Sequence, residues 1–531
     1  MSSSPRKHRL DLTWPIVICI LISVISTTAY LNFKHTDYSA TKVVNALDID
    51  NGDLEIDWTH YPTRTVTLDD TYRITQSGTY HLTGTLADGN VTIDTGVDSK
   101  VRLILDQVSI ASSNGPAIYC SAGDELVIEL VGNNTIIDGE TYDYYDSDVT
   151  GAIYSKADLS FTGEGTLNII ANYADAIVGK DDVKFSSGSY DITATDDGIR
   201  GKDSVYIVGG NFTIDAGADA IKSTNDIDVG KGFVLIEQGN FNLTAAAKGI
   251  KATRDVVLQG GNYSISSTDD SIHSDHYIGI SGGTYNINAG DDAIHANSEL
   301  IIDGGNINIA KAYEGLEAQV ITINNGDIRL TTTDDGINAG GGADGSSANR
   351  PGANQFEGDE NCILTINGGN LYINASGDGI DSNGWLYFND GEVVVDGPTN
   401  NGNGALDAGM GIIMNGGKVL AIGASGMAES LGNTSSINNI NVYFSEIYPA
   451  GTIISIQDAS GNEVFSHTSA KSFSHLAAGS TAFTLGNTYS IYINGELSES
   501  FTISGIVTNV GQNSTRQTGP GNPMQTRQNH R

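Results

Sequence analysis

The sequence contains few cysteines, which excludes a disulfide-based scaffold. Only three occur among the 531 residues. Cys19 lies in an apolar N-terminal segment, and Cys120 and Cys362 are separated by many copies of the repeat described below, too far apart to be bridged. The fold must therefore be held by side-chain packing, by backbone hydrogen bonds between strands and, where its carboxylates require them, by ions.

Basic side chains and proline are also scarce. The chain has 27 Lys and Arg against 64 Asp and Glu, for a net charge of -37. Because phosphate binding requires a cationic surface, this balance excludes nucleic acid as a partner. Proline occurs 9 times and glycine 65 times, with 39% hydrophobic residues. This composition favours many short strands and tight turns over a disordered chain.

The first 31 residues are predicted to be a targeting segment. A basic stretch, residues 2–9, precedes an apolar run from Trp14 to Leu31. The core of this run, residues 16–25, has the length of a signal-peptide core, and residues 27–29 offer a cleavage site. The whole run is also just long enough for an uncleaved membrane anchor. Both alternatives predict that the rest of the chain is exported, with residues 32–60 as a linker.

An acidic motif recurs along the middle of the chain with a period of about 22 residues. Each copy closes with Ile or Leu, at Ile177, Ile199, Ile221, Ile250, Ile272, Ile294, Leu316, Ile337, Ile380 and Leu406. The residue before each closing position and the residue two after it are Gly, Ala or Ser, and short alternating strands follow. The one long step contains an insertion, residues 340–360. No useful length of the chain shows helical spacing.

These features predict an all-β protein in which residues 61–436 form a right-handed parallel β-helix of about 22 residues per coil. Successive coils of such a fold lie about 4.8 Å apart. Residues 437–508 lack the acidic motif and are predicted to form a small C-terminal β domain that caps the open edge of the last coil. The polar residues 509–531 are predicted to be a disordered tail.

Equal phase in the repeat places residues side by side on successive coils. The position two residues before each closing residue, hereafter the carboxylate column, is acidic in eight of ten copies: Asp175, Asp197, Asp219, Asp270, Asp292, Glu314, Asp335 and Asp378. Lys248 and Gly404 occupy the other two copies. The preceding position adds Asp196, Asp269, Asp291 and Asp334. Stacked carboxylates about 4.8 Å apart repel by about 1 kcal/mol per pair in water, so the column needs a compensating interaction.

Three interpretations of the carboxylate column are open. Asp favours turns because it accepts hydrogen bonds from backbone amides. Calcium ions held between successive coils would supply positive charge, since Ca²⁺ binds roughly six to eight oxygen atoms. A carboxylate pair for acid–base hydrolysis is the third interpretation. Calcium is favoured, because turn chemistry does not readily explain Asp-Asp doublets in register and no single pair stands out for hydrolysis.

The position after each closing residue, hereafter the flanking column, changes from basic to acidic along the chain. It reads Val178, Arg200, Lys222, Lys251, His273, His295, Glu317, Asn338, Asp381 and Asp407. We expect an extended polysaccharide to lie on this strip, which is cationic from Arg200 to Lys251 and calcium-rich from Asp270 to Asp381. Local pairing of each base with a neighbouring carboxylate is the alternative. His273 and His295 are also candidates for a transition-metal site, although a polar surface is favoured there.

Aromatic side chains provide candidate platforms for sugar rings. Tyr313 lies beside the carboxylate column and is a candidate carbohydrate-binding residue. The most exposed cluster is expected at Tyr142, Tyr144 and Tyr145. The aromatic residues that recur at one phase of the repeat are predicted to form a structural ladder instead: Phe212, Phe241, Tyr263 and Tyr285.

The runs "TDDGIRGKDSVYIVGGNFTIDAGADAIKST", "YEGLEA" and "TTDDGINAGGGADGSS" resemble the bacterial carbohydrate-binding β-helix proteins related in structure to family 9 pectate lyases. The resemblance covers about residues 60–505. It implies a right-handed parallel β-helix, calcium held by aspartates of successive coils, and binding to an acidic plant polysaccharide such as polygalacturonate or to cellulose. The calcium ligands that it implies are Asp196, Asp197, Asp219, Asp269, Asp270, Asp291, Asp292, Glu314, Glu317, Asp334 and Asp335. Asp378 continues the carboxylate column and Asp381 the flanking column. Lys248 departs from the acidic pattern, so one calcium site should be missing there.

The expected function is therefore calcium-dependent, non-catalytic binding of a polysaccharide by a monomer at the outer face of the bacterial cell. A calcium-dependent polysaccharide lyase is one alternative, with Lys222 or Lys251 as the base. An adhesive rod stiffened by calcium is another. The net charge of -37 opposes binding of a polyuronate. Calcium bridging or the basic strip from Arg200 to Lys251 would have to overcome that repulsion.

Overall fold

The computed structural model describes residues 47–49, 55–143, 146–340 and 358–511. The predicted targeting segment, Tyr144, Tyr145, most of the insertion at 340–360 and the tail from residue 512 lie outside the described residues. Within the described ranges, no helix is long and apolar enough to span a membrane.

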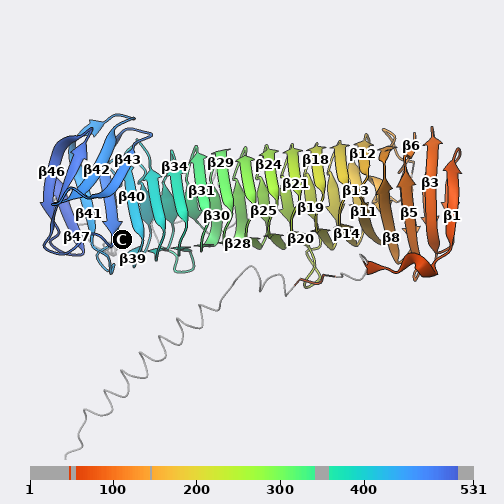
Figure 1. The fold of residues 1–531 in the computed structure, drawn as a ribbon, viewed down its shortest axis with the longest axis horizontal. Helices are drawn as coiled ribbons and strands as arrows, with labels where there is room; N and C mark the ends of the chain where they lie inside the picture. The colour runs from red at the N-terminus through yellow and green to blue at the C-terminus, as the bar shows by residue number, and fades with distance from the viewer. Residues whose placement is uncertain (1–46, 50–54, 144–145, 341–357, 512–531) are drawn as a thin grey trace, which may run out of the picture. The chain divides into compact units, whose positions relative to one another are not determined.

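From β1 (Thr63–Leu68) to β40 (Lys418–Gly423) the chain winds into a β-solenoid of about 14 turns with parallel strands (Figure 1). A typical coil contains β16 (Ile199–Gly201), β17 (Ser204–Ile207) and β18 (Asn211–Ala216), and each of these pairs in register with a strand of the coil before and the coil after. The predicted parallel β-helix is confirmed.

The ten closing residues lie on one row of strands and point into the solenoid. All ten are 1% exposed or less. The strands that carry them are β13 (Asp175–Gly179), β16, β19 (Ile221–Ser223), β22 (Ile250–Ala252), β25 (Ile272–Ser274), β28 (Ile294–Ile302), β30 (Leu316–Ile323), β32 (Ile337–Ala339), β35 (Ile380–Ser382) and β38 (Leu406–Ala408). The residue before each closing residue and the residue two after it must be small. A Cβ atom at Gly198 would lie 2.6 Å from the carbonyl oxygen of Ala220 on the next coil, and one at Gly201 would lie 1.9 Å from that of Ser204.

The recurring aromatic residues stack inside the solenoid, as predicted. The ring centroids of Phe212 and Phe241 lie 5.1 Å apart, those of Phe241 and Tyr263 lie 4.8 Å apart, and those of Tyr263 and Tyr285 lie 4.6 Å apart. The rings are nearly parallel, with interplanar angles of 3° to 7°. They come from the third strands of successive coils, β18, β21 (Asn240–Ala245), β24 (Asn262–Ser267) and β27 (Thr284–Asn288). The ladder therefore joins consecutive coils through side-chain packing as well as through backbone hydrogen bonds.

The parallel ladder ends where the C-terminal strands begin. β44 (Phe473–Ser480) pairs antiparallel with β40 and with β41 (Asn439–Tyr448), and β41 pairs in parallel with β47 (Val507–Gly511). A separate antiparallel sheet has the strand order β43 (Glu463–Thr468), β42 (Ile453–Asp458), β45 (Thr488–Ile493) and β46 (Glu496–Thr502). These strands share an apolar core of their own with β40 and β41. They cover the last coil, whose backbone groups would otherwise be open to pairing with another chain.

Replacing Phe241 by alanine should lower the free energy of unfolding by about 3–5 kcal/mol, because the ring is 3% exposed and stacks on both neighbouring coils. Urea denaturation followed by circular dichroism measures this change. Ile227→Ala is the matched control. Ile227 is 82% exposed, so its loss should change the free energy of unfolding by less than about 0.5 kcal/mol. If both substitutions lowered the free energy of unfolding equally, the aromatic ladder would not be a main contributor to stability.

Candidate functional site

The structure brings the two predicted columns together as one stripe along the solenoid. In the flanking column, Arg200 pairs in register with Lys222, Lys222 with Lys251, and Lys251 with His273. The register continues through His295, Glu317, Asn338, Asp381 and Asp407. The carboxylate column lies in the turns just before these strands, except for Asp175, which is the first residue of β13. Sequence phase alone was therefore enough to place the stripe.

The aspartates of the carboxylate column accept backbone N–H groups, as the turn interpretation predicted, but the donors lie on the next coil. One oxygen of each aspartate, Oδ1, accepts the backbone N–H of the corresponding residue on the next coil. The N–H of Asp197 donates to Asp175 at 3.1 Å, and that of Asp219 donates to Asp197 at 3.1 Å. The same bond recurs from Lys248 to Asp219, Asp292 to Asp270, Glu314 to Asp292, Asp378 to Asp335 and Gly404 to Asp378. These bonds between coils account for one oxygen of each aspartate in the column and leave its second oxygen for another partner.

In the first half of the stripe, that second oxygen meets a base. Arg200 lies 2.8 Å from Oδ2 of Asp175. Lys222 lies 2.9 Å from Oδ2 of Asp219 and 3.3 Å from Oδ2 of Asp197. Burial disfavours the charged form of Lys222, but the two carboxylates outweigh burial and raise its pKa. Local pairing, the alternative to an open cationic strip, thus describes Arg200 and Lys222.

Lys248 replaces an acid in the carboxylate column and neutralises the next coil. Its ammonium group lies 2.7 Å from Oδ2 of Asp270 and 2.9 Å from Oδ2 of Asp269. Burial disfavours its charge, but these carboxylates outweigh burial and raise its pKa. The sequence predicted a missing calcium site at this position. In the structure, the ammonium group of Lys248 takes the place that a cation would have beside Asp269 and Asp270.

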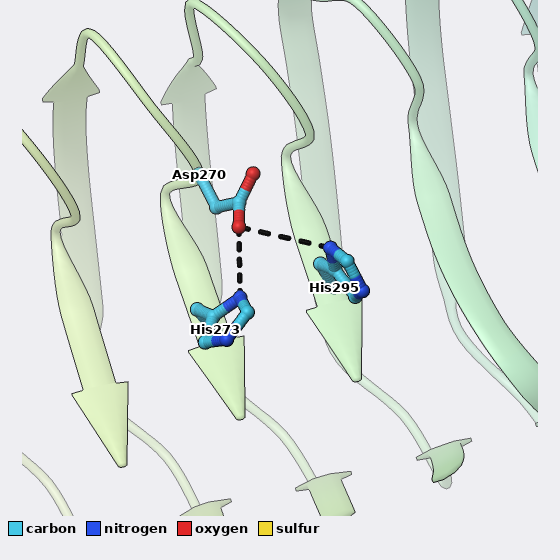
Figure 2. A group of neighbouring side chains, drawn as sticks. All are labelled: Asp270, His273 and His295. Atoms are coloured by element: carbon cyan, nitrogen blue, oxygen red, sulfur yellow. Dashed lines mark hydrogen bonds and ion pairs between the residues drawn. The ribbon is translucent and has the colours of Figure 1, made fainter. Parts of the chain in front are cut away.

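The two histidines of the flanking column follow, and Figure 2 shows the Asp270 carboxylate directed at both rings. Nδ1 of His273 lies 2.8 Å from Oδ2 of Asp270, and its Nε2 lies 2.9 Å from Oδ1 of Asp275. Burial disfavours the protonated ring, but hydrogen bonds to these two carboxylates raise the pKa of His273. Nδ1 of His295 lies farther from Oδ2 of Asp270, at 3.7 Å.

In the last part of the stripe, the carboxylates have no base. Six acids define this C-terminal acidic cluster: Glu314, Asp334, Asp335, Asp378, Asp381 and Asp407. No Lys, Arg or His among the described residues forms an ion pair with any of them. Burial, followed by repulsion from neighbouring carboxylates, raises the pKa of Glu314 and of Asp335 to about 8. Glu429, which the sequence analysis did not single out, joins the cluster from the segment after β40, and burial and Asp407 raise its pKa to about 8.

The backbone makes room for the cluster. A Cβ atom on Gly377 would lie 2.3 Å from Oδ1 of Asp334 and 2.3 Å from Oδ1 of Asp335. The two adjacent carboxylates of one coil therefore lie over a glycine of the next coil, where any side chain would displace them. Tyr313 borders the cluster, and its hydrogen bond with Asp334, followed by burial, raises the pKa of the tyrosine. Asn338 donates from Nδ2 to Oε2 of Glu314 at 2.9 Å.

The other predicted site residues lie at the outer edge of the stripe. Asp196 is exposed, and Asp269 and Asp291 are half-buried. Carboxylate oxygens of Asp269, Asp270 and Asp291 lie within 4.8 Å of one another, as do those of Asp175, Asp196 and Asp197. Lys251 is half-buried and forms no ion pair within the described part of the chain. These positions fit either a bound cation or solvent-exposed polar surface.

Two features beside the stripe suit a glycan. A cavity of about 280 Å³ is lined by residues that include Lys180, Arg200 and Lys202. Tyr142 stacks on Tyr173 with ring centroids 4.1 Å apart, and Tyr173 is 38% exposed. Sequence analysis named Tyr142 but missed Tyr173, because Tyr173 comes from the following coil and only the stacking of coils joins the two.

The repeat region matches a known protein family. The family described as "Carbohydrate-binding domain-containing protein" matches residues 68–315 and 263–348. A protein of Acetivibrio thermocellus with the same description is 31% identical over 127 residues, which are 23% of this chain and 44% of the relative. The chain thus spans less than half the length of that relative. A solved structure of a polysaccharide lyase-like protein from C. thermocellum, a gadolinium derivative, has 28% identity and a TM-score of 0.38, over 42% of this chain and 96% of that one.

The family match extends from residue 68 to residue 348, which is more than half of the 531 residues. It includes the basic half of the stripe, both histidines and the start of the C-terminal acidic cluster. The resemblance inferred from the repeated Asp-Asp-Gly-Ile motifs is confirmed. The chain belongs to the carbohydrate-binding domain-containing protein family.

Proposed function

We propose that the chain binds an acidic polysaccharide of the polygalacturonate type along the stripe, that calcium in the C-terminal acidic cluster is required, and that the glycan is not cleaved. The observation that carries this proposal is the contrast between the two halves of the stripe. The first half neutralises its carboxylates with Arg200, Lys222 and Lys248. The last part holds six carboxylates, one buried (Glu314) and five half-buried, without a base paired to any of them among the described residues.

The acidic cluster fits calcium by its chemistry. Burying an ionised carboxylate costs several kcal/mol unless an opposite charge accompanies it. Ca²⁺ prefers carboxylate and amide oxygens, and the cluster offers both within successive coils. Asp334, Asp335, Glu314, Asp378 and Asp381 would hold the ion. When bound, calcium supplies positive charge that can also attract a carboxylate of the glycan.

An acidic glycan suits the rest of the stripe better than a neutral one. The cavity beside Arg200 is lined by three basic side chains, each of which also pairs with a carboxylate of the chain: Arg200 with Asp175, Lys180 with Asp148 and Lys202 with Asp203. The donors that these pairs leave over are the ones that a uronate carboxylate would contact. Calcium at the other end provides a second attraction. Together they offset the repulsion expected from the net charge of -37. Cellulose, being neutral, would use neither feature.

Lyase chemistry receives less support from the stripe. β-Elimination needs a base that is neutral at the working pH. The carboxylates of Asp197 and Asp219 outweigh burial and raise the pKa of Lys222, so this lysine stays protonated at neutral pH.

The proposed setting is the outer face of the cell, because the apolar segment at residues 14–31 is of the kind that directs export.

Immobilised polygalacturonate should retain the chain in the presence of Ca²⁺ and release it when a chelator is added. Cellulose should retain little of it in either condition. The double substitution Asp335→Asn with Asp378→Asn should weaken calcium binding at least about tenfold, since it removes two ligand charges. Asparagine keeps the oxygen that accepts the backbone N–H of the next coil, so the solenoid is preserved. Asp215→Asn, at an exposed position of β18, is the matched control.

Retention on cellulose that survives the chelator would contradict the acidic-glycan proposal. A new ultraviolet-absorbing unsaturated product from polygalacturonate would show a lyase instead of a binder. Calcium-dependent melting without retention on either glycan would leave calcium a purely structural role.

The metal-free chain should lose stability as the pH rises. Burial raises the pKa of Glu314 and Asp335 to about 8, from ordinary values of 4.5 and 3.8. Between these ordinary values and pH 8 the folded state binds more protons than the unfolded state, so the free energy of unfolding decreases with increasing pH. Saturating Ca²⁺ should restore most of this loss at pH 8. Melting temperatures in chelator that do not fall between pH 5 and pH 8 would argue against the buried cluster.

A further inference from the structure

A second kind of metal site lies next to the acidic cluster. We propose that Asp292, His295 and Glu317 bind a first-row transition-metal dication, with Zn²⁺ as its probe, and that this site is distinct from the calcium cluster. The inference does not rest on the proposed function. Asp292 and His295 come from the turn and first residues of β28, and Glu317 comes from β30 on the next coil, so a bound metal would join two coils.

The three side chains converge on one point. Nδ1 of His295 lies 3.3 Å from Oδ2 of Asp292 and 3.4 Å from Oε2 of Glu317. One donor atom from each of the three residues lies within 4.8 Å of the other two. His295 and Asp292 are both 0% exposed, and Glu317 is 6% exposed.

The converging atoms form no hydrogen bond of good geometry with any described residue, although the carboxyl groups of Asp292 and Glu317 lie close enough to interact with each other. This holds for both ring nitrogens of His295, for Oδ2 of Asp292 and for Oε2 of Glu317. About nine in ten buried polar groups in native proteins are hydrogen-bonded, so three atoms without such a bond at one point, Nδ1 of His295, Oδ2 of Asp292 and Oε2 of Glu317, need a specific cause. The other oxygen of Asp292 is already used, because it accepts the backbone N–H of Glu314 at 3.2 Å.

The distances match metal ligation better than hydrogen bonding. A charge-assisted N–H to carboxylate bond is about 2.7–2.9 Å long. The edges of a tetrahedron around Zn²⁺, with Zn–N and Zn–O bonds of about 2.0–2.1 Å, are about 3.3–3.4 Å long. The observed separations of 3.3 Å and 3.4 Å between His295 and its two carboxylates correspond to such edges.

His273, one coil earlier, is an internal comparison. It occupies the same column and pairs in register with His295. Both of its ring nitrogens have partners, Asp270 at 2.8 Å and Asp275 at 2.9 Å. Asp270 also accepts from Lys248 at 2.7 Å. Its Oδ2 is therefore engaged, although it lies 3.7 Å from Nδ1 of His295 (Figure 2). The column position itself does not leave a histidine unpaired, and only His295 lacks partners.

The donor set selects the class of ion. Imidazole nitrogen suits Zn²⁺ and its first-row neighbours, whereas Ca²⁺ takes oxygen ligands almost exclusively. One nitrogen and two carboxylate oxygens form three protein ligands, which leaves one position of a tetrahedron for water. The two carboxylates also balance the charge of a dication, so the buried site is neutral when loaded.

The test uses the full chain after treatment with a chelator. One equivalent of Zn²⁺, added in an excess of Ca²⁺, should raise the melting temperature, and titration calorimetry should show one zinc site. Co²⁺ in place of Zn²⁺ should give the visible absorption bands of a tetrahedral site. His295→Gln should weaken Zn²⁺ binding at least about 100-fold and abolish the cobalt bands. His273→Gln is the matched control and should retain both.

Glu317→Gln provides a second variant if His295→Gln does not fold, and it should also weaken Zn²⁺ binding and change the cobalt bands. The proposal is overturned if Ca²⁺ displaces Zn²⁺ at equal concentration, or if His273→Gln and His295→Gln lose Zn²⁺ binding equally. It is also overturned if neither metal changes the melting temperature or the spectrum of the unmutated chain.

Discussion

The in-register stacking of parallel coils is the constraint on which the rest of this structure depends. Each residue of a coil lies about 4.8 Å from its equivalents on the two neighbouring coils. Any side chain that recurs at one phase therefore becomes a continuous column. Apolar columns give the core of Ile and Leu and the stacked rings of Phe212, Phe241 and Tyr263. Charged columns have no such simple solution, because identical charges repel at this spacing.

The negative charges of the carboxylate column are neutralised in different ways along the solenoid. Every aspartate of the column that accepts a backbone N–H from the next coil uses one oxygen for the fold. The second oxygen meets Arg200 or Lys222 on the early coils and His273 further on. From Glu314 onward, no Lys, Arg or His among the described residues forms an ion pair with a carboxylate of the column. The gradient from basic to acidic in the flanking column is therefore a gradient in how the carboxylates are neutralised, and the proposed calcium ion belongs to the end where no base pairs with them.

The transition between these two regimes falls at His295. Its neighbour His273 is held by two carboxylates in good hydrogen-bond geometry, and the next residue of the column, Glu317, is itself an acid. His295 is thus placed between a neutralised and an unneutralised part of the stripe. A nitrogen ligand at this boundary separates the proposed transition-metal site from the oxygen-only cluster that suits calcium.

The sequence by itself determined the period, and with it the coil, the buried Ile and Leu positions, the aromatic ladder and the membership of both charged columns. These follow from phase alone, because in-register stacking converts equal phase into contact. Only the tertiary structure decided which partner each side chain takes. The reach of Lys248 to Asp270, the contribution of Glu429 and the stacking of Tyr173 on Tyr142 depend on side-chain conformation and on neighbouring coils. The difference between His273 and His295 has both origins: Asp275, two residues after His273, is replaced by Asn297 two residues after His295, but only the structure shows that Asp275 reaches the first ring and that the second ring forms no hydrogen bond.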